Sequence, residues 1–251
     1  MKRLRKVLLA TASSVALMAV AANAADMGYP VKAPPQSVVA ERWSGPYIGV
    51  NAGAAWNRAR FFDQGLDGFV GVPFAFPAGE FWSPNEAGFT GGGQIGYNWQ
   101  AGSFVYGLEA DLNWANSKTS ALFLATPNAG DVTASTKLDW FSTVRGRLGV
   151  TFSPVLLYVT GGLAIGHFSD SWGQTAAPTI FASDTVRLGW TVGAGLEYMF
   201  AQNWTVKVEG LYADFGATDI VGFPPGTPGF GYRSRFEHTT TVVRAGLNWK
   251  W

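Results

Sequence analysis

From Tyr47 to the end of the chain, apolar residues recur at every second position, which is the period of a β-strand rather than of a helix. Eight segments show this alternation, and in each of them the apolar residues alone set the phase of the strand. The segments are Tyr47–Trp56, Phe89–Trp99, Phe104–Trp114, Leu138–Phe152, Val155–Gly166, Val186–Phe200, Trp204–Tyr212 and Thr239–Trp251. The pattern therefore predicts an all-β protein of eight strands.

The charged residues test this interpretation, because they played no part in setting the phase. Ten of them, five acidic and five basic, fall on the face opposite the apolar side chains. These residues are Glu109, Asp111, Asp139, Arg145, Arg147, Arg187, Glu197, Lys207, Glu209 and Arg244. A soluble β-sandwich also alternates, with its apolar face buried, so further features are needed to separate it from a membrane barrel.

Short and long connections alternate along the chain. Tight turns are predicted at Gln100–Ser103, Ser153–Pro154 and Ala201–Asn203, and long loops at Asn57–Gly88, Ala115–Thr136, His167–Asp184 and Ala213–His238. Short turns at one end and long loops at the other are typical of outer-membrane barrels, where the turns are periplasmic and the loops extracellular.

Aromatic residues gather at the two ends of the predicted strands, and aliphatic residues occupy the middle. Amphipathic rings settle at headgroup depth on a lipid-facing wall, whereas a buried core has no reason to sort them by height. The predicted girdles contain Trp56, Trp114, Trp140 and Trp190 on the extracellular side and Trp99, Phe152, Trp204, Trp249 and Trp251 on the periplasmic side. Because an open sheet edge in lipid leaves backbone groups unpaired, we expect a closed eight-stranded antiparallel transmembrane β-barrel.

The first residues predict a secreted precursor. Residues 2–6 carry four basic side chains, Val7–Val20 is an apolar run, and Ala22–Ala24 supplies the small residues that a signal peptidase requires. The run is shorter than the roughly 20 residues that a membrane-spanning helix needs, which favours a cleaved signal over an anchor. The predicted organisation is a signal peptide over 1–24, a flexible periplasmic leader over 25–42 and a barrel domain over 43–251.

Composition narrows the chemistry. The chain has 251 residues, a formal net charge of +1 and no Cys. The net charge is close to zero, so the composition does not indicate binding to nucleic acid. The absence of Cys excludes a thiolate nucleophile and a Cys-ligated zinc. Neither His nor carboxylate spacing resembles a metal site, so we expect no metal and no cofactor.

An eight-stranded barrel is roughly wide enough for side chains to fill its interior rather than to enclose an aqueous channel. Six of the inward charges fall near mid-height, and we expect them to form a hydrogen-bonded plug. They are Glu109, Asp111, Arg145, Arg147, Glu209 and Arg244. The alternative is an ion-selective or gated pore, but a selective pore favours one sign of charge and these signs are balanced.

Three segments carry a resemblance to a known family. Trp43–Asn51 resembles the W-x-G-x-Y-x-G opening of the small alphaproteobacterial outer-membrane barrels, the major surface or immunogenic proteins often labelled "porin family". Leu157–Ala164 is similar to a recurrent strand of that family, and Val243–Trp251 to its terminal strand. The resemblance implies an envelope role, exposure to host or environment, and haemin binding in some members. It also implies that the terminal aromatic, usually Phe and here Trp251, is read by the barrel-assembly machinery.

Candidates for catalysis are few. The two His are His167, where a strand meets a predicted loop, and His238, at the top of the last strand. Ser169, Asp170 and Ser171 follow His167, but neighbours in a loop do not make a catalytic triad, and we expect them to be solvated loop residues. A ligand site at His167 or His238, with haemin as its ligand, rests on the family resemblance.

Aromatic residues in the predicted loops are the other feature with binding potential. They are Phe61, Phe62, Phe69, Phe74, Phe76, Phe81 and Trp82 in the first loop, and Phe223, Phe230 and Tyr232 in the fourth. They could mark an interaction site, or they could pack as a cap or dip into the outer leaflet.

Together these features predict a non-enzymatic outer-membrane protein of a Gram-negative bacterium, with a structural role and with binding through its extracellular loops. Its expected partners are outer-membrane lipid, the assembly machinery and a host or environmental ligand. The alternatives are a passive porin-like channel for small solutes and a haemin-binding surface protein.

Overall fold

The computed structural model describes residues 42–66, 80–82, 87–123, 132–174, 179–222 and 232–251. In these ranges it contains nine β-strands and no helix. The strands are β1 (Gly45–Leu66), β2 (Glu80–Trp82), β3 (Ala87–Ala101), β4 (Phe104–Phe123), β5 (Val132–Phe152), β6 (Val155–Gln174), β7 (Thr179–Ala201), β8 (Trp204–Gly222) and β9 (Tyr232–Lys250). The predicted signal peptide and all but the last residue of the predicted leader lie outside the described residues, so both stay predictions.

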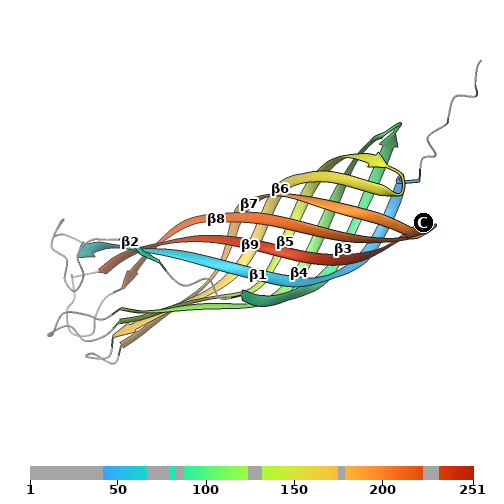
Figure 1. The fold of residues 1–251 in the computed structure, drawn as a ribbon. Helices are drawn as coiled ribbons and strands as arrows, with labels where there is room; N and C mark the ends of the chain where they lie inside the picture. The colour runs from blue at the N-terminus through green and yellow to red at the C-terminus, as the bar shows by residue number, and fades with distance from the viewer. Residues whose placement is uncertain (1–41, 67–79, 83–86, 124–131, 175–178, 223–231) are drawn as a thin grey trace, which may run out of the picture. The chain divides into compact units, whose positions relative to one another are not determined.

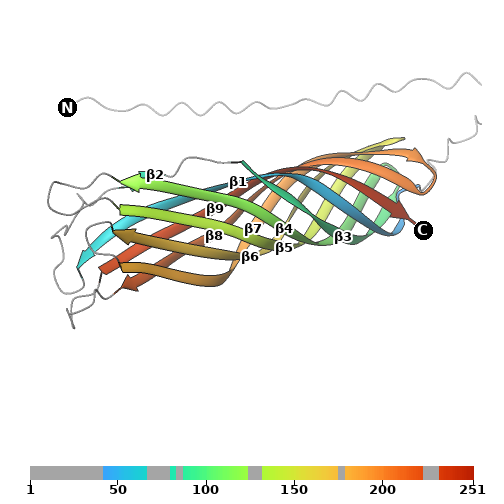
Figure 2. The same cartoon turned by 90° about the horizontal axis from the view of Figure 1, so that it is seen from below.

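Eight of the strands form a closed barrel. Each of β3 to β9 pairs with its neighbour in chain order, β1 pairs with β3, and β9 returns to pair with β1, all antiparallel. The closing pair runs from Tyr47 opposite Lys250 to Leu66 opposite Tyr232. The short β2 pairs with the far part of β1 only, at Arg60–Phe62. Figures 1 and 2 show the tilted strands around one axis, so the predicted closed antiparallel barrel is confirmed.

Three of the connections are two-residue turns, and all lie at one end of the barrel. They join Ala101 to Phe104, Phe152 to Val155 and Ala201 to Trp204. Gly102 in the first turn has a φ of 61°, a left-handed conformation that is common in two-residue hairpin turns and that glycine adopts without strain. We call this end the turn end and the opposite end the outer end.

The strands are much longer than the predicted segments. From Phe104 to Trp114, the ten steps between residues of β4 span about 34 Å along the strand and, at a tilt of about 40°, about 26 Å along the barrel axis. That distance matches the apolar band of an outer-membrane barrel, yet β4 continues to Phe123. Much of each predicted long loop is therefore strand, and the wall extends past the outer aromatic residues (Figure 1).

The predicted loop boundaries were wrong because the pattern that defines a strand in lipid ends where the apolar band ends. In β4 the residues beyond Trp114 include Ser117, Lys118 and Thr119, which are polar whichever face they occupy. Alternation between apolar and polar side chains disappears there, although backbone pairing with β5 continues to Phe123 opposite Val132.

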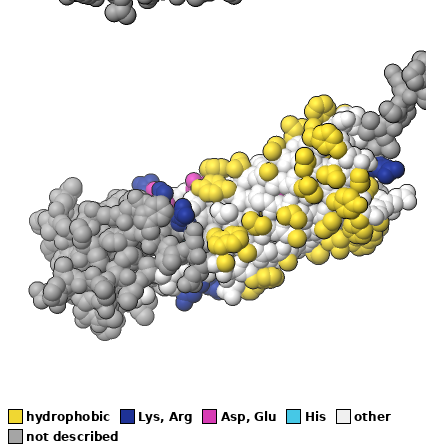
Figure 3. Space-filling view, viewed as in Figure 1, with side chains coloured by type: hydrophobic (Ala, Val, Ile, Leu, Met, Phe, Trp, Pro, Cys, Tyr) yellow, Lys and Arg dark blue, Asp and Glu magenta, His cyan; other side chains and the backbone are white. Residues whose placement is uncertain are grey.

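The two faces of the wall differ as the charge pattern predicts. Val144 and Leu148 point outward and are each 57% exposed, whereas Arg145 and Arg147 between them point inward and are 1% and 4% exposed. Apolar side chains gather in a band on the outside of the barrel (Figure 3). A soluble sandwich would bury the first pair and expose the second, so that alternative is excluded.

One local prediction fails in β5. The sequence places Leu138 on the outward face and Asp139 inside, but Leu138 is fully buried and Asp139 faces outward. The pairing of β5 with β6 shifts between Leu138 and Trp140, so that one extra residue is inserted. Because side chains alternate at every residue, a single insertion exchanges the two faces for the rest of the strand.

Within the described ranges, no helical segment is long and apolar enough to cross a bilayer.

Candidate functional site

The six residues predicted for the interior lie in one network of ion pairs, and Arg145 on β5 is at its centre. Nη2 of Arg145 donates to Glu109 and, at 3.0 Å, to Oδ2 of Asp111, both on β4. Its Nη1 donates to Oε2 of Glu209 on β8 at 3.0 Å. One guanidinium therefore joins three carboxylates from two elements on different sides of the barrel.

Arg244 on β9 closes the network from the other side. Its Nη2 donates to Oδ2 of Asp111 and to Oε1 of Glu209, each at 2.8 Å. Each of these two carboxylates therefore binds both Arg145 and Arg244. These are charge-assisted hydrogen bonds, which are stronger than neutral ones, although Nε of Arg145 and Nη1 of Arg244 have no hydrogen-bond partner among the described residues.

Two further charges, Glu197 and Lys207, complete the network. Nη2 of Arg147 donates to Oε2 of Glu197 at 2.6 Å, and Nζ of Lys207 donates to Oε1 and Oε2 of Glu109 at 2.9 and 2.8 Å. The sequence places both residues on the inner face but does not show their partners. With them the network holds four cations and four carboxylates, all at most 4% exposed.

Two tyrosines that the sequence did not single out also belong to this network. The hydroxyl of Tyr47 donates to Oε2 of Glu109 at 2.7 Å, and the hydroxyl of Tyr158 donates to Oε2 of Glu209 at 3.0 Å. A Cβ at Gly96 would lie 2.4 Å from the ring end of Tyr47, and one at Gly195 would lie 2.5 Å from that of Tyr158. Inward glycines thus provide the space for both rings. The sequence did hold a signal for them: both tyrosines fall on the positions that alternate with the outward apolar residues, which predicts that they point inward.

Apolar side chains lie inside the barrel on both sides of the charged network. Toward the turn end is a buried cluster of Trp43, Val105, Leu156, Tyr158 and Met199. Toward the outer end is a second cluster, which we call the septum. It contains Ala55, Ala115, Leu138, Phe141, Ala164, Phe168, Leu211, Ala213, Phe215 and Val242. The rings of Phe168 and Phe215 meet edge to face with their centroids 5.0 Å apart.

A second polar layer lies beyond the septum. Oδ2 of Asp170 accepts a hydrogen bond from Nη2 of Arg187 at 2.9 Å, and Nε2 of His238 lies 3.5 Å from the same oxygen. Thr136 donates to the other oxygen of Asp170 at 2.9 Å. Asp170 is 3% exposed, so the prediction that it is a solvated loop residue was wrong, and His238 beside it is fully buried.

His167 lies on the opposite face of the wall from His238. It is in β6 rather than in a loop, faces outward, and stacks on Trp140 with ring centroids 6.0 Å apart. The two His do not converge, so a ligand site at one of them would not include the other. The hydroxyl of Ser169 donates to Asp139 at 2.8 Å, the same carboxylate that contacts His167. In a nucleophilic relay the hydroxyl donates to the imidazole, so this arrangement is not a catalytic triad.

In the ranges that the structure describes, no cluster of three or more His, Cys, Asp or Glu side chains has the geometry to hold a metal ion.

The residues of the two predicted girdles all lie on the outward face. Six of them are at least 40% exposed, namely Trp99, Trp114, Phe152, Trp190, Trp204 and Trp251, while Trp56, Trp140 and Trp249 are partly covered by neighbours. Neighbouring rings touch within each girdle. The rings of Trp190 and Tyr212 are 5.7 Å apart at the outer end, and those of Trp249 and Trp251 are 4.3 Å apart at the turn end.

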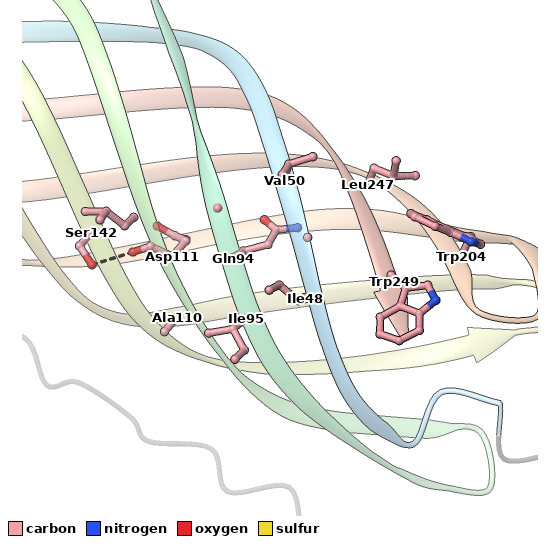
Figure 4. Close-up of a pocket in the computed structure, with 13 residues that line it drawn as sticks. Ile48, Val50, Gln94, Ile95, Ala110, Asp111, Ser142, Trp204, Leu247 and Trp249 are labelled. Carbon is pink, nitrogen blue, oxygen red and sulfur yellow. Dashed lines mark hydrogen bonds between the residues drawn. The ribbon is translucent and has the colours of Figure 1, made fainter. Parts of the chain in front are cut away.

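The outer wall is hollowed where small residues face outward. A groove of about 940 Å³ is bordered by Ile48, Val50, Ile95, Leu247 and two girdle tryptophans, and its base includes Gly93, Ala110 and Ser142 (Figure 4). The hydroxyl of Ser142 donates to the backbone carbonyl of Asp111 at 2.6 Å. Because that hydroxyl is satisfied within the wall, an apolar chain can lie over the groove at little cost.

The loop aromatics of the sequence prediction divide into two groups. Phe61, Phe62, Phe81, Trp82 and Tyr232 belong to strands β1, β2 and β9 rather than to loops. Phe69, Phe74, Phe76, Phe223 and Phe230 lie outside the described residues.

Comparison with known proteins identifies the family. Residues 12–247 match the model of the outer membrane protein beta-barrel domain. The chain is 35% identical over 248 residues to the 31 kDa outer-membrane immunogenic protein of Brucella melitensis, covering 95% of this chain and 97% of that protein. It is 36% identical over 152 residues to the 22 kDa outer membrane protein of Rhizobium leguminosarum, covering 60% and 64% of the two chains.

Among solved structures, the outer membrane protease OmpT of Escherichia coli aligns with a TM-score of 0.50 at 10% identity, over 86% of this chain and 99% of that one. That likeness shows the barrel fold alone. The closed barrel, its apolar outer band and the family match lead to one conclusion. The chain belongs to the outer membrane protein beta-barrel domain family, together with the immunogenic outer-membrane proteins of Brucella, and lies in the outer membrane of a Gram-negative bacterium.

Proposed function

We propose that this protein is a non-enzymatic structural component of the outer membrane, that its barrel is closed to solutes, and that it contacts partners through its extracellular end. The observation that carries the closed barrel is the succession of layers inside it. An apolar cluster, a charged network, the apolar septum and a second polar layer follow one another along the axis.

The charged network favours closure more than selective conduction. Its four cations and four carboxylates are bound to one another, so a passing ion would have to break several buried contacts. An apolar constriction opposes wetting in addition, and the septum is of that kind. A channel selective for one sign of ion would also present an excess of the opposite charge.

Planar-bilayer recording tests the closed lumen. We expect the purified, refolded protein to give no steady unitary conductance, whereas a general porin reconstituted in the same bilayers does. Stable open steps of one size from this protein would contradict the proposal and favour the alternative, a passive channel for small solutes.

The proposed extracellular end can be tested by labelling, because the chain has no Cys of its own. Lys118 and Asp184 are exposed on the outward face beyond the outer girdle, and Ser103 is exposed in a turn at the other end. We expect a membrane-impermeant maleimide to label Lys118→Cys and Asp184→Cys on intact cells, and Ser103→Cys only after lysis. Labelling of Ser103→Cys on intact cells would contradict this orientation.

The proposed contact with the assembly machinery concerns the terminal strand. β9 pairs with β1 and ends at Lys250, and Trp251 after it is 61% exposed. We expect Trp251→Ala to reduce the fraction of protein that reaches the folded, heat-modifiable form in cells, and Trp251→Phe to preserve it. Equal assembly of all three proteins would contradict this role of the terminal aromatic.

Two other functions receive less support from the geometry. Haemin capture with His167 or His238 as the axial ligand is not part of the proposal, because His238 is fully buried and the ring of His167 is stacked on Trp140. Lipid hydrolysis would need a hydroxyl activated by an imidazole, and Ser169 donates instead to Asp139.

A further inference from the structure

A second hollow lies on the outside of the barrel where β8, β9 and β1 run side by side, just beyond the outer girdle. It encloses about 470 Å³ and is lined mainly by charged and hydroxyl side chains, unlike the apolar groove over the middle of the wall. Among the lining residues are Trp56, Arg58, Arg60, Tyr212, Arg235 and Glu237. Figure 3 shows Lys and Arg side chains just past the end of the apolar band.

The arginines of this hollow stand at the depth of lipid headgroups. Trp56, Arg58 and Arg60 follow one another on the outward face of β1, two residues apart. A rise of about 3.3 Å per residue and a tilt of about 40° place Arg58 about 5 Å and Arg60 about 10 Å above Trp56. The headgroup layer of one leaflet is about 5–8 Å thick, so Arg58 lies within it and the Cα of Arg60 stands just beyond it.

Arg235 extends the series further outward. In the pairing of β1 with β9, Arg60 is opposite Glu237, and the next outward position on that face of β9 is Arg235. The three guanidinium groups therefore form a ladder that rises away from the bilayer. A glycerophospholipid headgroup is too short to meet all three, whereas a phosphorylated sugar headgroup is long enough.

Carboxylates also line the hollow, namely Asp214 on β8 and Glu237 on β9. Asp214 accepts a hydrogen bond from the backbone N–H of Gly216 at 2.8 Å, which occupies it in the local turn of β8. Glu237 lies 4.0 Å from Arg60 and 3.9 Å from Arg235, and all three side chains are at least 35% exposed. Ion pairs this long and this exposed are weak, so a phosphate can replace Glu237 as the partner of either arginine. Asp219 is a further acid nearby, exposed and opposite Arg235 in the pairing of β8 with β9.

We propose that this hollow binds the phosphorylated headgroup of a saccharolipid of the outer leaflet. Planar guanidinium groups hold phosphate oxygens through paired hydrogen bonds, which favours Arg over Lys for this task. Thr239 and Thr241 offer hydroxyls to sugar oxygens, and the rings of Trp56 and Tyr212 face the first part of the acyl chains. The inference is independent of the closed lumen, since the site lies wholly on the outer face.

Two lysines elsewhere on the wall provide a matched control. Lys118 on β4 and Lys137 on β5 are register partners, face outward and lie just beyond the girdle residues Trp114 and Trp140. They have the same charge and a similar height. They do not line the hollow, and Lys137 is paired with Asp139.

Native mass spectrometry of the folded protein in detergent, titrated with diphosphoryl lipid A, tests the proposal. We expect the triple variant Arg58→Gln, Arg60→Gln, Arg235→Gln to raise the Kd by about tenfold or more, as the loss of several charge-assisted hydrogen bonds would. The double variant Lys118→Gln, Lys137→Gln should bind within about twofold of the wild type. Dephosphorylated lipid A should bind the wild type no better than phosphorylated lipid binds the triple variant.

Three outcomes would overturn the assignment. The first is wild-type affinity of the triple variant, and the second is an equal loss in the lysine control. The third is complete displacement of the lipid by an equimolar amount of inorganic pyrophosphate, which would make the site one for free phosphate. Heat-modifiable migration of each variant reports that it is folded, and Arg60→Gln alone provides a milder substitution with the same expected direction.

Discussion

Replacement of Arg145 by Met removes the cation at the centre of the charged network. Its side chain is fully buried and contacts Glu109, Asp111 and Glu209. The substitution leaves three cations facing four carboxylates inside the barrel. Removal of one partner from a buried ion pair destabilises a protein by about 3–5 kcal/mol, because the other charge stays buried and uncompensated.

The structure places the expected value at the lower end of that range. Glu109 keeps its contacts with Lys207, and the other two carboxylates keep Arg244. We therefore expect the free energy of unfolding to fall by about 3 kcal/mol, well short of three separate pair energies. Urea titration of the protein in phospholipid vesicles, followed by tryptophan fluorescence, measures this difference.

Two further variants complete the experiment. Lys137→Met removes an outward ion pair with Asp139 whose side chains are 43% and 26% exposed, and it should cost less than about 1 kcal/mol. Addition of Glu109→Gln to Arg145→Met restores the balance of charge, and the double variant should be more stable than the sum of the single effects by about 1 kcal/mol or more. If Arg145→Met costs no more than Lys137→Met, water reaches the network and the proposal of a closed lumen fails.

Three other predictions use the same preparation. Gly96→Ala should destabilise the barrel by about 1–3 kcal/mol, since its Cβ would lie 2.4 Å from a buried tyrosine, whereas Gly93→Ala, with 3.9 Å to the nearest atom, should change little. Leu138→Ala should cost about 2–4 kcal/mol because it leaves a cavity in the septum, and more than Leu148→Ala, where lipid fills the gap; equal costs would contradict the assigned faces. In a haemin titration, any Soret shift should survive His238→Ala, because that ring is fully buried. Loss of the Soret shift in this variant would show that the outer end of the barrel opens to admit haemin.

Much of the fold could be predicted from the sequence because lipid imposes a simple rule on a barrel wall. Side chains such as Val144 and Leu148 must be apolar where they face acyl chains, and the residues between them are free to be charged. That rule determined the eight strands of the barrel and their phase within the apolar band, apart from Leu138 and Asp139 in β5, and with them the three tight turns and the two aromatic girdles. It also identified the inward charges, since Arg145 and Arg147 could not face hydrocarbon.

The tertiary structure alone decided what lies beyond the apolar band. Because the wall there faces water on the outside, apolar and polar residues no longer need to alternate. Only backbone pairing shows that β4 continues to Phe123. The inserted residue near Leu138 is likewise invisible in the sequence, because it changes the phase without changing the composition.

Partners across the barrel are decided in the same way. The sequence by itself determined that Glu109, Arg145 and Glu209 point inward, since the period of two requires it. Glu109 and Arg145 meet because they are register partners on the neighbouring strands β4 and β5. Arg145 meets Glu209, 64 positions away on β8, at 3.0 Å only because the sheet closes on itself between β9 and β1. Alternation along a strand decides which face a side chain takes. Its ion-pair partner lies on another strand, and only the closed barrel determines which strand and which residue that is.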